Sequence, residues 1–232
     1  MTIHRVIGTN RTVEMTAQAF EALRAQHERV LVDVGTGDGR YAHARALAAA
    51  DTLVIGIDAL EEPMGESARK ANRRPDKGGS PNLLFVRASV EHVPEELRAS
   101  ADTVTVMLPW GRLLEGIVLG DERIWSGVAA LAQPRARFEI TLNGEIWESS
   151  TPARYADLPV PTPEYVARVV APAAATVGIE LGAARLLDAQ EAKALPSTWA
   201  RKLGHGRSHP RFVRVDGSGA ATTSRPSGGP LG

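Results

Sequence analysis

The residues most clearly suited to chemistry form a glycine-rich loop. Gly35, Gly37 and Gly39 stand two apart directly after an apolar run, with the acids Asp33 and Asp38 among them. Glycines let a backbone turn tightly and approach a ligand closely. The spacing G-x-G-x-G departs from the G-x-G-x-x-G of dinucleotide sites. Negative charge here disfavours a phosphate but suits an ammonium or a sulfonium group, and S-adenosylmethionine carries both.

Two further segments are expected at the same edge of the fold. Asp58 ends an apolar run, where a carboxylate can accept hydrogen bonds from both ribose hydroxyls of a nucleoside. NAD would use Asp58 identically, so this residue does not discriminate between the two cofactors. Ser89, Val90 and Glu91 follow the next apolar run and are suited to line an adenine slot. Glu91 is equally consistent with a solvated loop carboxylate or with a residue beside a helix cap.

Two tryptophans indicate a planar substrate. Trp110 follows an apolar run, and Pro109 and Gly111 on either side hold the indole as a rigid face suited to stacking. A tryptophan packed under a helix is the more common arrangement, but Trp199 supplies a partner. Two indoles over one pocket can sandwich a base that has been pulled from its stack.

Basic residues accompany these segments, as is typical of nucleic-acid binding. Arg201, Lys202 and Arg207 follow Trp199. Arg69 and Lys70 lie in an expected helix, and such a run is equally typical of a solvated helix face.

The composition limits what the loop can belong to. The chain has 232 residues, 43% hydrophobic and 23% charged, as expected for a globular protein with one sizeable core. Acidic and basic residues number 27 each, so any surface for nucleic acid must be local. The absence of cysteine excludes disulfides and cysteine-based catalysis, and we expect no metal site. Without a leader or a long apolar run, we expect a cytoplasmic protein with no membrane partner.

Apolar runs and helix-period segments alternate along the chain, which predicts an α/β fold with a largely parallel sheet. Strands are expected at residues 30–33, 53–58, 83–86, 103–108, 137–142, 179–186 and 212–215, and helices at 41–50, 64–74, 124–132 and 164–175.

Both ends of the chain extend beyond this pattern. Residues 3–13 predict a hairpin that turns at Gly8-Thr9-Asn10, and a helix follows from Thr16 to Glu28. This unit, residues 1–29, either caps the ligand pocket or covers an edge of the sheet. The core is expected over 30–216. Residues 217–232, rich in Gly, Ser, Thr and Pro, predict a disordered tail.

The glycine loop with its acids, Asp58, Glu91 and two tryptophan motifs together resemble one family. The motifs are Pro-Trp-Gly-x-Leu-Leu at 109–114 and Ser-x-Trp-Ala-x-x-Leu at 197–203. Over residues 3–215 the chain resembles the aminoglycoside-resistance 16S rRNA methyltransferases, which methylate N1 of adenine 1408 at the decoding site. The resemblance implies a class I S-adenosylmethionine-dependent methyltransferase fold, Rossmann-like, with a seven-stranded mixed sheet and an N-terminal β-hairpin extension.

The resemblance also implies roles for particular residues. Trp110 and Trp199 would clamp a flipped adenine, with Pro109 and Ser197 in support. Lys202 and Arg207 would contact the RNA backbone, and from their charge we also expect Arg69, Lys70 and Arg201 to bind RNA. S-adenosylmethionine would be held by Asp33, Gly35, Asp58 and Glu91. From the neighbouring positions in the same segments we also expect cofactor contacts from Thr36, Gly37, Asp38, Ala59, Ser89, Val90 and Leu108. The partner would be 16S rRNA within the 30S ribosomal subunit, and we expect the protein to act as a monomer.

Two positions depart from the family pattern. Arg112 stands where relatives carry a small hydroxyl residue, which puts the local polar contact in question. His209 stands where a relative carries arginine, so the basic surface there is weaker or is shared with Arg211.

The absence of an evident catalytic base fits this reaction, because adenine N1 can attack a sulfonium methyl through its in-plane lone pair. Alternatives are a methyltransferase for another RNA such as tRNA or for a small molecule, a non-catalytic RNA-binding scaffold, and an NAD-dependent oxidoreductase. The glycine spacing and the lack of a Tyr-x-x-x-Lys motif weaken the oxidoreductase. Asp33 and Asp58 weaken the scaffold, and paired tryptophans with cations favour RNA.

Overall fold

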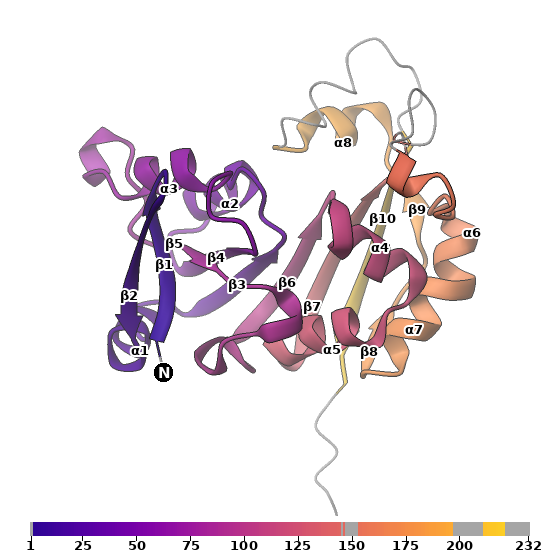
Figure 1. Ribbon diagram of the computed structural model, residues 1–232, viewed down its shortest axis with the longest axis horizontal. Coiled ribbons are helices and arrows are strands. Elements are labelled where there is room, and N and C mark those ends of the chain that lie inside the picture. Colours follow the sequence, from indigo (N-terminus) through magenta and orange to yellow (C-terminus); the bar gives the residue numbers. More distant parts are fainter. Residues whose placement is uncertain (1, 145, 147–152, 197–210, 221–232) are drawn as a thin grey trace, which may run out of the picture.

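The computed structural model describes residues 2–144, 146, 153–196 and 211–220, and one sheet runs through it (Figure 1). Five parallel strands form its centre. Their order is β5 (Leu83–Arg87), β4 (Thr52–Asp58), β3 (Arg29–Val34), β6 (Ala101–Met107) and β7 (Ala132–Asn143). The direction in which successive strands are added reverses at β3. Open α/β sheets bind ligands at such a point, outside the carboxyl ends of the strands.

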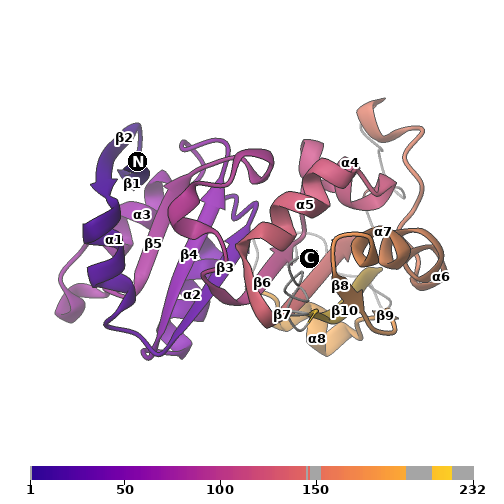
Figure 2. The same cartoon turned by 90° about the horizontal axis from the view of Figure 1, so that it is seen from below.

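Helices cover both faces of the sheet (Figure 2). On one face lie α2 (Arg40–Ala48) and α3 (Gly65–Ala71), whose small side chains pack against β4 and β5 in one core cluster. The other face carries α4 (Gly111–Leu119) and α5 (Glu122–Leu131), whose apolar side chains belong to the largest cluster. Because both faces are covered, β3 and β4 are built from continuous apolar runs rather than from alternating residues.

The N-terminal hairpin extends the sheet. Strands β1 (Thr2–Gly8) and β2 (Arg11–Thr16) pair with each other, and β1 pairs antiparallel with β5. Helix α1 (Ala17–Arg24) follows, and the Thr16 side chain accepts the Ala19 N–H at 3.2 Å, as expected for its cap. The hairpin therefore covers an edge of the sheet. No hairpin residue lines the cavity described below.

The end of the chain differs from the sequence-based expectation in two respects. The strand expected at 179–186 is two short strands, β8 (Ile179–Leu181) and β9 (Arg185–Leu186), which pair with different parts of β10 (Phe212–Gly219). β10 is also longer than expected. Residues 217–219, expected in a disordered tail, pair with β8 and β7 because ladder hydrogen bonds override their weak strand propensity.

Several helices also differ from their predicted bounds. The helix expected at 64–74 is α3 and ends at Ala71, and the one expected at 164–175 comprises α6 (Pro163–Tyr165), a π-helical turn (Val166–Val170) and α7 (Ala171–Ala175). The sequence reasoning missed α4 and α8 (Ala189–Ala194). Among the described residues, no helix is long and apolar enough to span a bilayer.

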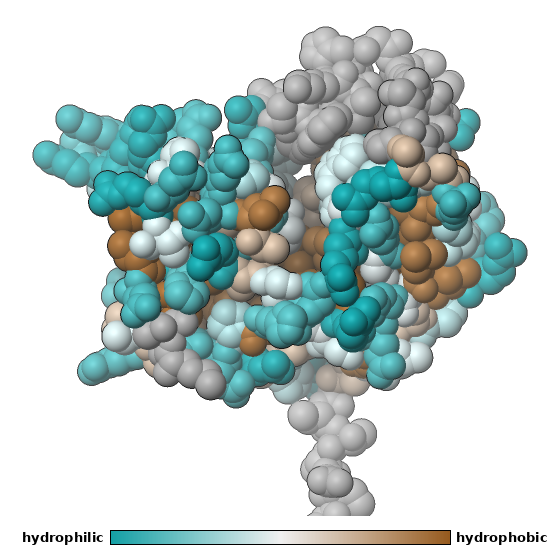
Figure 3. All heavy atoms as spheres, viewed as in Figure 1, coloured by the Kyte–Doolittle hydropathy of each residue, from teal (hydrophilic) through white to brown (hydrophobic). Residues whose placement is uncertain are grey.

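Polar side chains cover most of the face shown in Figure 3, and apolar ones show in a hollow near its middle and in patches on either side.

Candidate functional site

A cavity of about 790 Å³ lies at the carboxyl ends of β3, β4, β5 and β6. It contains ten of the eleven residues that were expected to hold a cofactor, together with Trp110. These ten are Gly35, Thr36, Gly37, Asp38, Asp58, Ala59, Ser89, Val90, Glu91 and Leu108. Four segments that are distant in sequence therefore meet around one space.

The glycine loop is held against the neighbouring strand. The N–H groups of Gly35 and Thr36 both donate to the carbonyl of Ile57, at 2.9 and 3.0 Å. Gly35 has φ +68°, and a Cβ at this position would stand 2.4 Å from Cδ2 of Leu113. The positive φ favours glycine here, and a side chain would also have to displace the end of the Leu113 side chain on α4.

Asp33 lies beneath the loop and not on the cavity wall. Its side chain is buried, and it accepts hydrogen bonds from Thr36 Oγ1 at 2.6 Å and Thr105 Oγ1 at 2.7 Å. Burial raises the pKa of Asp33 to about 6, although both hydroxyls act in the opposite direction. The resemblance implied that Asp33 holds the cofactor. In the structure it holds Thr36, which does line the cavity.

Asp58 closes the loop from the side of β4. Its Oδ2 accepts the Gly37 N–H at 3.0 Å, and its Oδ1 accepts the Leu60 N–H at 3.0 Å. Burial raises the pKa of Asp58, while these backbone hydrogen bonds oppose the shift. Each carboxylate oxygen has further lone pairs, so Asp58 can still accept from a ligand.

Glu91 and Arg112 form an ion pair at the cavity. Ser89 caps the short 3-10 turn Val90–His92, and its hydroxyl contacts the Glu91 carboxylate. Arg112 Nε lies 2.6 Å from Glu91 Oε1. Burial of Glu91 opposes ionisation, but the hydrogen bonds from Ser89 and Arg112 outweigh it and lower the pKa of Glu91. Glu91 is therefore a paired carboxylate in the cavity wall, and Arg112 pairs with it instead of supplying a hydroxyl.

Trp110 lies at a sharply turned junction between β6 and α4. Leu108 has φ +50° and Gly111 has φ +60°, so left-handed residues stand on both sides of Pro109 and Trp110. Pro109 is buried and Trp110 is half-buried. A left-handed conformation is costly for leucine, and such strain concentrates at functional sites. As expected, Trp110 lines the cavity.

Among the cavity-wall residues to which sequence reasoning gave no role are Arg154 and Tyr155. They belong to a 3-10 turn, Ala153–Tyr155, in a stretch without helical or strand periodicity. Arg154 bonds to Glu115 of α4, and Tyr155 contacts Trp110. No motif in the sequence marks either residue.

Of the residues expected to contact RNA, the structure describes Arg69 and Lys70. Arg69 and Lys70 lie on α3, where Lys70 Nζ pairs with Glu66 Oε1 at 2.7 Å. Neither residue lines the cavity. Ser197, Trp199, Arg201, Lys202 and Arg207, as well as His209, lie outside the described residues, so their roles stay predictions.

The sheet order, with antiparallel β10 beside β7 and a cavity under a glycine loop, defines a class I methyltransferase fold. The family model for NpmA, 16S rRNA (adenine(1408)-N(1))-methyltransferase, matches residues 4–217. The chain belongs to this family.

Individual relatives cover almost the whole chain. The 16S rRNA (adenine(1408)-N(1))-methyltransferase of Streptoalloteichus hindustanus is 36% identical over 205 residues, which are 88% of this chain and 94% of that protein. The protein of the same name from Escherichia coli is 32% identical over 214 residues, 91% of this chain and 97% of its own. A solved structure of a tryptophan-to-alanine variant of this methyltransferase from Catenulisporales acidiphilia, with the cosubstrate S-adenosylmethionine, has a TM-score of 0.87 and 35% identity. It covers 97% of this chain and 100% of that one.

Proposed function

We propose that this protein transfers the methyl group of S-adenosylmethionine to N1 of adenine 1408 in 16S rRNA, within the 30S subunit, and so confers aminoglycoside resistance. One observation carries the proposal: a single cavity joins the glycine loop and Asp58 to the indole of Trp110. A site for a nucleoside cofactor and an aromatic face for a base therefore share one space. Family membership supports the identity of the nucleotide.

The cavity fits S-adenosylmethionine. Its volume of about 790 Å³ is that of an ordinary small-molecule site. A Cβ added to Gly37 would meet no atom within 4 Å, so the loop borders open space. Asp58 would accept from the ribose, and Ser89 to Glu91 would border the adenine. When bound, the cofactor supplies a methyl group on a positively charged sulfur.

The reaction requires the adenine to be positioned accurately and does not require a catalytic base. The lone pair of adenine N1 forms the new bond to the methyl carbon as the carbon–sulfur bond breaks, so no proton has to be removed. The protein must hold the base in line with the methyl group and keep water away. In this chain Trp110 would supply a face on which the base stacks, and the turn between β6 and α4 would fix the position of this face in the cavity.

Substitution of Trp110 tests this proposal. Stacking of a base on an aromatic side chain contributes about 1–3 kcal/mol, so Trp110→Ala should lower turnover by about 5- to 150-fold. Trp110→Phe, which keeps a smaller aromatic face, should lose less. Calorimetry should find the affinity for S-adenosylmethionine unchanged in both variants. Full turnover by Trp110→Ala would contradict the stacking role.

The substrate is tested with the unmodified protein. Tritium transfer from labelled S-adenosylmethionine should reach 30S subunits, and primer extension should stop at adenine 1408, because a methyl group on N1 blocks base pairing. Transfer to tRNA, or a stop at another nucleotide, would favour the alternative methyltransferases. Cofactor binding without transfer to any RNA would favour a scaffold.

We also propose that the protein acts as a cytoplasmic monomer, and light scattering checks its oligomeric state.

A further inference from the structure

Tyr155 joins a remote segment to the first turn of α4. Its hydroxyl oxygen accepts the N–H of Gly111 at 2.7 Å, across 44 positions of sequence. Gly111 is the first residue of α4, and the N–H groups of a first helical turn have no partner within the helix. The cap position is held by Trp110, whose side chain makes no capping hydrogen bond. Tyr155 therefore supplies an acceptor for the first N–H of the helix, whereas a capping serine or aspartate would accept from the second or third.

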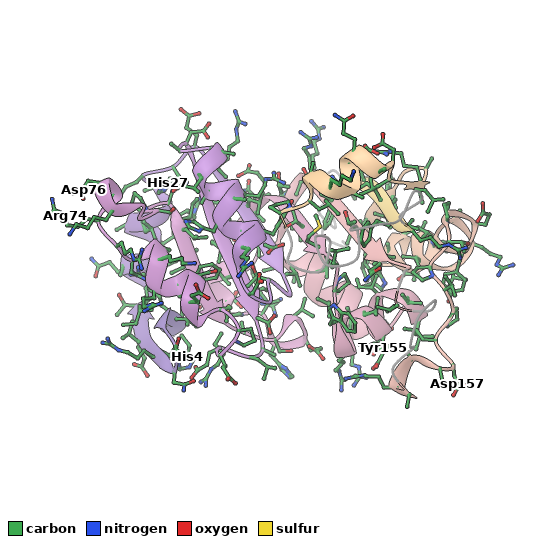
Figure 4. The ribbon with its side chains drawn as sticks, turned by 90° about the horizontal axis from the view of Figure 1, so that it is seen from above. His4, His27, Arg74, Asp76, Tyr155 and Asp157 are labelled. Carbon is green, nitrogen blue, oxygen red and sulfur yellow. The ribbon has the colours of Figure 1, made fainter. Side chains whose placement is uncertain are left out.

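The ring of Tyr155 also touches the indole. The ring centroids of Trp110 and Tyr155 lie 5.8 Å apart with 50° between their planes, a tilted geometry that aromatic pairs favour. Tyr155 is 1% exposed, so its ring has little freedom to move away. Figure 4 shows Tyr155 on the half of the molecule opposite Arg74 and Asp76.

A second contact reinforces the first. The guanidinium carbon of Arg154 lies 5.3 Å from the centre of the Tyr155 ring, and Arg154 Nε and Nη2 reach Glu115 Oε1 at 2.9 and 2.8 Å. Glu115 lies one turn beyond Gly111 on α4. The turn Ala153–Tyr155 is thus attached to two successive turns of α4, at Gly111 and at Glu115.

The backbone beside Trp110 needs such an attachment. Gly111 has φ +60°, and glycine crosses between positive and negative φ more readily than any other residue. Apart from Tyr155, this peptide group between Trp110 and Gly111 is held only by a long hydrogen bond, in which the Trp110 carbonyl accepts the Leu114 N–H at 3.4 Å. Without an acceptor for the Gly111 N–H, the peptide group and the indole beside it would be held less firmly. An acceptor at 2.7 Å fixes this peptide in one orientation.

We propose that Tyr155 is a positioning residue for methyl transfer, which acts by fixing the orientation of Trp110. The inference rests on the proposed function, since it takes Trp110 to be the stacking face for the base. Tyr155 holds the peptide of Gly111 through its hydroxyl and limits the tilt of the indole through its ring. Misplacement by about 1 Å can lower turnover as much as 100-fold without any lost contact to substrate.

Tyr155→Phe removes the hydroxyl and keeps the ring, and Tyr165→Phe is its matched control. Tyr165 Oη donates to the carbonyl of Val118 at 3.1 Å, near the other end of the same helix, and does not line the cavity. With 30S subunits and S-adenosylmethionine, Tyr155→Phe should lower kcat about tenfold. KM for the subunit and Kd for the cofactor should stay within about twofold. Tyr165→Phe should keep kcat within about twofold.

The kinetic contrast decides the inference. Equal kcat in Tyr155→Phe and the unsubstituted protein would overturn it, as would equal losses in the two tyrosine variants. A loss of cofactor affinity by Tyr155→Phe that accounts for the whole effect would also overturn it. Failure of the unsubstituted protein to methylate adenine 1408 would refute the proposed function instead, so the two failures are distinguishable.

A double-mutant cycle identifies the route of the effect. If Tyr155 acts through Trp110, then adding Tyr155→Phe to Trp110→Phe should change single-turnover rates less than it does alone. Amide exchange over residues 110–113 should also be faster in Tyr155→Phe than in Tyr165→Phe. Additive rate losses with unchanged exchange would contradict a route through this turn.

Discussion

Asp33→Asn should stabilise the protein increasingly as the pH rises. Asp33 is 1% exposed and accepts hydrogen bonds from two hydroxyls, and its pKa is raised from 3.8 to about 6. Between these values the unfolded chain has released its proton while the folded chain still holds one. The unfolded state is therefore favoured progressively as the pH rises through this window, and the loss of stability is nearly complete above about pH 7.

The magnitude follows from the two pKa values. A shift from 3.8 to about 6 corresponds to about 3 kcal/mol at full ionisation, at about 1.36 kcal/mol for each unit. At about pH 5 the loss is about 1.6 kcal/mol, and at about pH 7.5 it is about 3 kcal/mol. Asparagine carries no charge and can accept from one threonine hydroxyl and donate to the other. Any change in hydrogen bonding is thus a constant offset that does not vary with pH.

Urea unfolding of both proteins at several pH values measures this effect. The free energy of unfolding of Asp33→Asn minus that of the unsubstituted protein should increase by about 1.4 kcal/mol between about pH 5 and about pH 7.5. Other titrating groups are common to both proteins and cancel in the difference. A difference that is flat with pH, or that falls as the pH rises, would refute the view that burial governs Asp33.

Two further substitutions test the walls of the cavity. Gly35→Ala should lower the free energy of unfolding by about 1–2 kcal/mol through its positive φ alone, which urea unfolding measures. The contact of the new methyl group with Leu113 should add to this loss and should also weaken cofactor binding, which calorimetry measures. Arg112→Ser should change stability by less than about 1 kcal/mol, because the Arg112 side chain is 62% exposed. In the same variant the pKa of Glu91 should rise, which carboxyl NMR titration measures, because Arg112 helps to lower it.

The cofactor side of the site was predictable because its signals are local. An apolar run followed by spaced glycines specifies a strand and a loop within ten residues, and Asp58 ends the adjoining strand. The position of Asp33 was not predictable in the same way. Its partner Thr105 lies opposite it on β6, and that pairing exists only once the strands have assembled. An acid that looked suited to a ligand is instead satisfied inside the protein.

The two helices that the sequence analysis did not predict, α4 and α8, were missed for different reasons. α8 carries a readable signal, because Asp188 and Glu191 form a capping box. The start of α4 carries none, since the side chain of its cap residue Trp110 makes no capping hydrogen bond and the Gly111 N–H is accepted by Tyr155. Only the end of α4 is marked in the sequence, by Gly120 with φ +73°. A helix start that is capped by a distant side chain leaves no mark in the adjacent sequence.

The two sides of the cavity are anchored by contacts of very different range in the sequence. The glycine loop is held by Ile57 carbonyl bonds and by Asp58, all on the strand that pairs directly with β3. The Trp110 side depends on the docking of Tyr155 from 44 positions away. Damage to that docking leaves these hydrogen bonds of the glycine loop in place, so cofactor binding should persist where turnover is lost. This reaction transfers no proton, so no catalytic acid or base complicates the comparison. A variant that keeps cofactor affinity but loses turnover therefore identifies a residue that positions the substrate base rather than one that binds the cofactor.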